Sequence, residues 1–69
     1  MSLYRDQAEI LINLFNSRTP VGGNVLAINM GVGLKTLKKE IDIVNEYCKE
    51  NGCCIMSKTG EGYYLEVTD

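Results

Sequence analysis

A single glycine between two helical patterns is the feature that most constrains how this chain can fold. Residues 24–30 and 34–50 both place apolar side chains at helical spacing, and Gly31 falls where the first helix needs a left-handed terminating residue. Ala27, in the middle of that helix, is small enough for the next helix to cross close by. A turn this short joins two helices at a steep angle. The sequence therefore predicts a helix-turn-helix over residues 23–41.

Further elements are predicted on both sides of this unit. Helical spacing predicts a first helix over residues 4–16, which ends before Pro20 because proline cannot continue a helix. Two runs, residues 53–57 and 63–67, flank a turn containing glycines and predict a β-hairpin. Three helices and a hairpin make an α+β winged helix-turn-helix, with the two-stranded hairpin as the wing. We expect one such domain over residues 4–67; a bare three-helix bundle with an unrelated hairpin is the alternative.

Apolar stripes on these elements predict the core. The long third helix carries one stripe at helical spacing, and the first helix and the hairpin each present an apolar face. We also expect the aromatic side chains to be buried or half-buried. The candidate core residues are Ile10, Leu11, Leu14, Phe15, Leu26, Ala27, Met30, Leu34, Leu37, Ile41, Val44, Cys48, Tyr63, Leu65 and Val67.

The composition argues against an enzyme. The 69-residue chain has no histidine, which is the commonest general base and metal ligand, and three cysteines alone do not complete a zinc site. An odd number of cysteines without a secretory segment indicates free thiols in a reducing cytoplasm. No apolar run approaches the ~20 residues of a membrane helix. We therefore expect a cytoplasmic binding module with no catalytic residue, metal, cofactor, small-molecule ligand or membrane partner.

The charge is acidic overall but unevenly distributed. Seven Lys and Arg residues against nine Asp and Glu residues give a net charge of −2, which argues against nucleic-acid binding through net charge alone. Residues 33–39, however, contain three lysines and no acid. A helix-turn-helix presents this part of its second helix to the DNA major groove, and a glycine-containing wing tip approaches phosphates closely. The expected DNA-binding residues are Lys35, Thr36, Lys38, Lys39, Lys58, Thr59 and Gly60.

Several short motifs together resemble a known family. They are Arg5…Ile10-Leu11-x-x-Leu14, Leu26-Ala27-x-x-Met30-Gly31-Val32, Lys35-Thr36-Leu37-Lys38-Lys39-Glu40-Ile41-x-x-Val44-Asn45, Gly52-x-x-Ile55 and Gly60-x-Gly62-Tyr63-x-Leu65. Over residues 5–67 the chain resembles the N-terminal winged helix-turn-helix of bacterial transcription regulators of the BglG/LicR type, which carry phosphotransferase-system regulation domains. Biotin-repressor and DeoR-type N-terminal domains are close alternatives.

This resemblance implies sequence-specific binding of double-stranded operator DNA by a regulator of carbohydrate uptake or use. It also implies a homodimer held mostly by domains absent from this chain, which would then be an excised N-terminal fragment. Antiterminator relatives bind RNA, but through a different N-terminal domain.

A protein–protein interaction or dimerisation module is the second interpretation. Winged helices also dock partners, and an acidic chain suits that role. This interpretation gains if the acids Glu40, Asp42, Glu46 and Glu61 cancel the charge of the lysines, or if Lys35 and Lys38 are buried in a homodimer interface.

Overall fold

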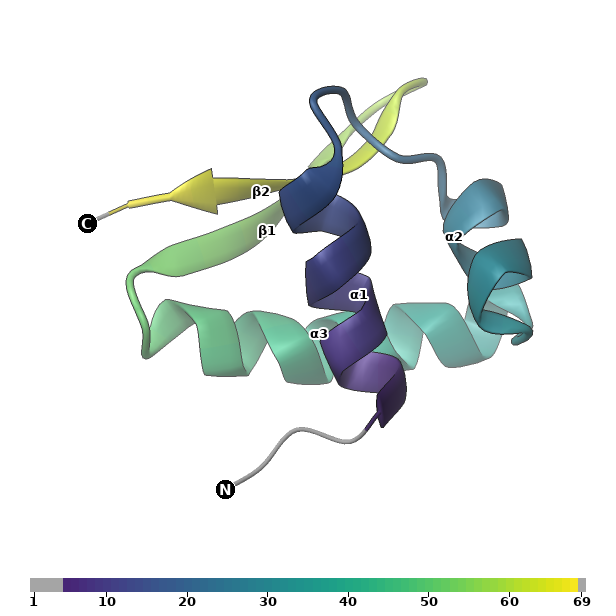
Figure 1. Ribbon diagram of the computed structural model, residues 1–69, viewed down its shortest axis with the longest axis horizontal. Helices are drawn as coiled ribbons and strands as arrows, with labels where there is room; N and C mark the ends of the chain where they lie inside the picture. Colours follow the sequence, from purple (N-terminus) through teal and green to yellow (C-terminus); the bar gives the residue numbers. More distant parts are fainter. Residues whose placement is uncertain (1–4, 69) are drawn as a thin grey trace.

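The three helices and the hairpin form in the predicted order. The computed structural model describes residues 5–68, and it contains α1 (Arg5–Asn16), α2 (Gly23–Met30), α3 (Leu34–Lys49), β1 (Cys53–Lys58) and β2 (Gly62–Val67) (Figure 1). The strands pair antiparallel, so the chain has the α+β arrangement of a winged helix. The expected first residue of α1, residue 4, lies outside the described residues.

The helices enclose one core under the hairpin. In Figure 1, α1 crosses in front of α3, α2 lies near the amino-terminal end of α3, and the hairpin lies above α3. Both α1 and β1 pack on α3, and α1 also contacts β2. Among the described residues, nine apolar side chains form the buried core: Ile10, Leu14, Leu26, Ala27, Leu37, Ile41, Val44, Cys48 and Ile55.

Gly31 ends α2 as the sequence predicts. Its φ of 71° is left-handed, and its amide donates to the carbonyl of Ile28 while that of Val32 donates to the carbonyl of Ala27. These two bonds make a Schellman motif, which satisfies carbonyls that the helix end would leave without partners. The turn then leads directly into α3 through Gly33, whose extended backbone precedes the first residue of that helix.

Three expected core residues are instead exposed. Leu34 is 46% exposed, Phe15 is 76% exposed and Val67 is 70% exposed, so their prediction as core residues is wrong. Each lies in the terminal turn or at the last residue of its element, where the apolar pattern continues but the neighbouring elements no longer cover it. Four other expected core residues are only partly buried, and they pack against the core: Leu11, Met30, Tyr63 and Leu65.

Two polar connections hold the wing in place. The amide of Val21 donates to the carbonyl of Tyr63, and the amide of Tyr63 donates back, each at 2.8 Å, so the α1–α2 loop adds one bridge to the hairpin. On the other strand, the amide of Ile55 donates to Oδ1 of Asn45 on α3 at 2.8 Å. The wing is therefore bonded both to the loop before α2 and to α3.

Candidate nucleic-acid interface

The first two turns of α3 present an exposed basic face. Lys35, Lys38 and Lys39 are all exposed, whereas Leu37 beside them is fully buried. Spacings of three and four residues place these lysines on one side of the helix, because neighbours on a helix surface recur at that interval. Thr36 is also exposed. The same turn that buries Leu37 therefore directs the positive charge to solvent.

A groove joins this face to the wing. This wing groove has a volume of about 340 Å³ and runs between the start of α2, the start of α3 and the hairpin tip. The expected site residues that line it are Lys38, Lys58, Thr59 and Gly60, and Leu34 contributes its exposed side chain. The other expected residues, Lys35, Thr36 and Lys39, lie exposed on α3 without lining the groove. The fold thus brings part of the helix site and the hairpin site together.

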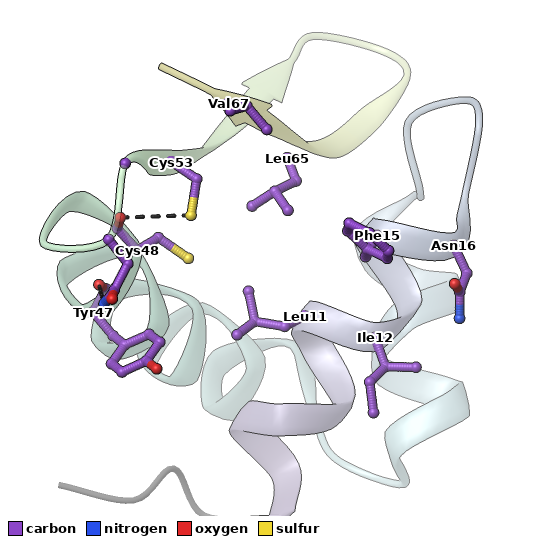
Figure 2. A pocket seen from close by; sticks show the side chains of 11 residues that line it. Leu11, Ile12, Phe15, Asn16, Tyr47, Cys48, Cys53, Leu65 and Val67 are labelled. Carbon is purple, nitrogen blue, oxygen red and sulfur yellow. Dashed lines mark hydrogen bonds between the residues drawn. The ribbon is translucent and has the colours of Figure 1, made fainter. Parts of the chain in front are cut away.

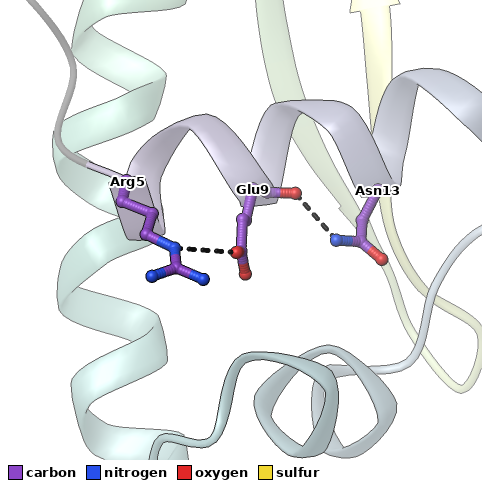
Figure 3. Close-up of polar contacts among 3 residues, drawn as sticks. All are labelled: Arg5, Glu9 and Asn13. Carbon is purple, nitrogen blue, oxygen red and sulfur yellow. Dashed lines mark hydrogen bonds and ion pairs between the residues drawn. The ribbon is translucent and has the colours of Figure 1, made fainter.

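Within residues 5–68, three of the seven Lys and Arg side chains are engaged in ion pairs. Nε of Arg5 lies 3.5 Å from a carboxylate oxygen of Glu9, whose main-chain carbonyl also accepts a bond from the side chain of Asn13 (Figure 3). Lys49 pairs with Glu46 at 3.7 Å and Lys58 with Glu61 at 3.2 Å.

The other four cations are available to a ligand. Within residues 5–68, the side chains of Arg18, Lys35, Lys38 and Lys39 make no ion pair or hydrogen bond. Three of them are the lysines expected from the sequence. The fourth, Arg18 in the α1–α2 loop, was not expected, because nothing in the sequence places that loop beside the wing.

Of the acids near the site, Asp42 is exposed and follows Lys39 by three residues and Lys38 by four, so it lies on the same side of α3 as the lysines. Glu40, which follows the lysines on α3, accepts a hydrogen bond at 3.0 Å from Nε2 of Gln7, a nearly buried side chain of α1. Its carboxylate is therefore held toward α1. Glu61 does pair with Lys58, but both side chains are more than half exposed. An exposed pair of this kind stabilises by only ~0.2–1 kcal/mol, so a phosphate can replace the carboxylate.

A second, apolar groove lies at the other end of α3. It has a volume of about 530 Å³, and Figure 2 shows Leu11, Phe15, Tyr47, Leu65 and Val67 around it. The exposed side chains of Phe15 and Val67 lie on its wall, which is where these two residues go instead of the core. The groove is separate from the basic face, since it is built on the carboxyl-terminal turn of α3.

The cysteines are free thiols, as expected. Cys48 is fully buried, and burial, with a smaller effect from a hydrogen bond to Cys53, raises the pKa of its thiol from 9.0 to about 12. Within residues 5–68, no three side chains of His, Cys, Asp or Glu are grouped so that they could hold a metal ion. In the same residues, no helix has the length and apolar character needed to cross a membrane.

Comparison of the chain with models of protein families, with curated proteins and with solved structures finds no match. The basic face of α3, the wing groove and the free cations are therefore the features that bear on function.

Proposed function

We propose that this domain binds double-stranded DNA, with the first turns of α3 in the major groove and the wing against the backbone or minor groove. The observation that carries the proposal is the wing groove, where Lys38 of α3 and Lys58 of the hairpin line one surface. An α-helix fits the major groove, which is about 12 Å wide, and a second element beside it then meets the adjacent backbone.

The kind of cation limits the kind of binding. Lysine contributes a point charge and lacks the planar fork with which arginine reads guanine. Lys35, Lys38 and Lys39 therefore supply chiefly phosphate attraction, with base contacts limited to single hydrogen bonds. A single domain with a net charge of −2 binds weakly on this basis. Regular operator affinity would come from two such domains in a dimer.

The motif resemblance supports a more specific setting. A winged helix with these motifs is similar to the N-terminal domains of BglG/LicR-type regulators, and we infer a cytoplasmic bacterial regulator of carbohydrate uptake or use. In that setting the homodimer is held through domains outside this chain. Glu40 is hydrogen-bonded to Gln7 of α1 and is held toward that helix, which supports DNA over the interaction module, whereas the exposed Asp42 lowers the positive charge on the lysine side of α3.

The proposal is tested by comparing two lysines on the same helix. Binding of a fluorescent duplex is measured by anisotropy for the wild type, Lys38→Ala and Lys49→Ala. Lys49 is the matched control because it lies at the far end of α3 and pairs with Glu46. Lys38→Ala should weaken binding several-fold and Lys49→Ala should leave it nearly unchanged. Equal effects, or no binding at millimolar protein, would contradict the proposal; a stable dimer that ignores DNA would favour the interaction module.

A further inference from the structure

Arg18 lies in the α1–α2 loop and does not line the wing groove. It lines a hollow of about 530 Å³ between the α1–α2 loop and the hairpin, which we call the outer hollow. Lys58 and Tyr64 line the same hollow from the strands. Lys58 also lines the wing groove, and of the adjacent tyrosines of β2, Tyr63 lines the wing groove and Tyr64 the outer hollow. Because successive side chains of a strand point to opposite faces, the two cavities meet β2 from different faces.

We propose that the outer hollow binds a backbone phosphate of the DNA strand that runs along the outer flank of the wing, with Arg18 as its cation. This inference rests on the proposed function and adds a second strand to it. A hairpin tip that enters a minor groove, about 6 Å wide, has a sugar–phosphate strand on each side. The wing groove with Lys38 faces one strand, and the outer hollow with Arg18 faces the other.

The loop that carries Arg18 is held against the wing. Oγ of Ser17 donates to the carbonyl of Thr19 at 2.6 Å, and Pro20 restricts the backbone immediately after it. The two hydrogen bonds between Val21 and Tyr63 then join the loop to β2. Only two residues separate Arg18 from Val21, which is hydrogen-bonded to the hairpin. When the wing binds DNA, Arg18 is therefore held close to the same DNA segment.

The side chain of Arg18 suits a phosphate. It is exposed, and within residues 5–68 it makes no ion pair or hydrogen bond, so binding an anion breaks no existing contact. Its planar guanidinium donates two parallel hydrogen bonds to phosphate oxygens, which a lysine does not. Lys58, in contrast, must first release Glu61. Arg18 is the cation on this flank that is ready to bind.

The test uses the whole chain and a labelled duplex over a range of salt concentrations. Arg18→Ala should lower affinity several-fold at low salt and reduce the slope of log K against log salt by about 0.9, which is one phosphate contact. Arg18→Lys should keep the slope and recover part of the affinity. The matched control is Arg5→Ala, which removes an arginine on α1 that is paired with Glu9; it should leave both quantities unchanged. Phosphate-ethylation interference should lose one contact, on one strand only, with Arg18→Ala.

The outcomes separate this inference from the proposed function. If the wild type binds DNA with a salt slope and Arg18→Ala behaves like Arg5→Ala, the outer hollow is not a phosphate site and the function of α3 stands. If the wild type does not bind DNA, the proposed function fails and this inference fails with it. Thermal unfolding of the variants, expected to be unchanged at these exposed positions, shows that a loss of affinity reflects the lost contact.

Discussion

Substituting Gly62 tests how the wing is joined to the rest of the molecule. Gly62 has a φ of 123°, a backbone conformation that L side chains rarely adopt, and a Cβ added there would collide with the carbonyl group of Val21. Val21 is the residue whose amide and carbonyl both bond to Tyr63, next to Gly62. The variant Gly62→Ala therefore strains the turn and pushes the hairpin away from the α1–α2 loop at the same time.

The cost follows from these two effects. A non-glycine residue in such a region costs about 1–3 kcal/mol. Relieving the collision separates Val21 from Tyr63, and each of their two hydrogen bonds contributes about 0.5–1.5 kcal/mol. We expect Gly62→Ala to lower the free energy of unfolding by about 2–6 kcal/mol, a large share of the 5–15 kcal/mol typical of a small domain.

Gly60→Ala is the matched control. Gly60 lies in the same turn with a φ of 79°, but an added Cβ there meets no heavy atom within 4 Å. This variant has the conformational cost without the collision, about 1–2 kcal/mol. Urea unfolding followed by circular dichroism gives both values, and amide exchange at Val21 and Tyr63 should accelerate only in Gly62→Ala. Equal destabilisation by the two variants would refute the reasoning.

Two other predictions concern the core. Leu37→Ala should lower the free energy of unfolding by about 2–5 kcal/mol in urea unfolding because Leu37 is fully buried. Leu34→Ala, at a position that is 46% exposed, should lower it by less than about 1 kcal/mol. Similar values for the two variants would contradict the finding that Leu37 belongs to the core and Leu34 does not. The raised pKa of Cys48 predicts an alkaline loss of stability. The unfolded chain releases the thiol proton near pH 9.0 and the folded chain keeps it to about 12, so this contribution is complete below pH 9.0 and is lost as the pH rises toward 12. Cys48→Val should show a shallower decline; an identical pH profile would count against it.

Local rules predicted the elements of this fold well. Gly31 was recognisable because a left-handed helix end favours glycine, and Pro20 and the hairpin glycines mark real breaks. The apolar spacing also identified Leu37, Ile41, Val44 and Cys48 as buried. These features depend on residues that are close together in the chain, within one helical turn or one hairpin, so they can be recognised in the sequence.

Features at the ends of elements depend on tertiary packing and were missed. The apolar spacing of their helices includes Phe15 and Leu34, yet both side chains are exposed. Whether such a residue is covered depends on the length and crossing point of the neighbouring helix or strand. The bridge between Val21 and Tyr63 joins residues far apart in the chain. That bridge holds the loop of Arg18 beside the hairpin, whereas the surroundings of Arg18 in the sequence are those of an ordinary turn.

The proposed interface also combines features that are visible in the sequence with features that depend on tertiary packing. Net charge alone argued against DNA, and the position of three lysines at the front of one helix argued for it. The fold adds that Glu40 is held toward α1 and that Lys38 and Lys58 line one groove. Neither arrangement follows from the spacing of these residues along the chain.

The salt dependence of duplex binding by the wild-type chain tests the central claim most directly. If Lys35, Lys38, Lys39 and Lys58 meet phosphates, log K should fall linearly with log salt with a slope of about −3 to −4, since each neutralised phosphate contributes about −0.9. Arg18 would add one further contact. An affinity that does not change with salt, or no binding at millimolar protein, would contradict DNA recognition by this face.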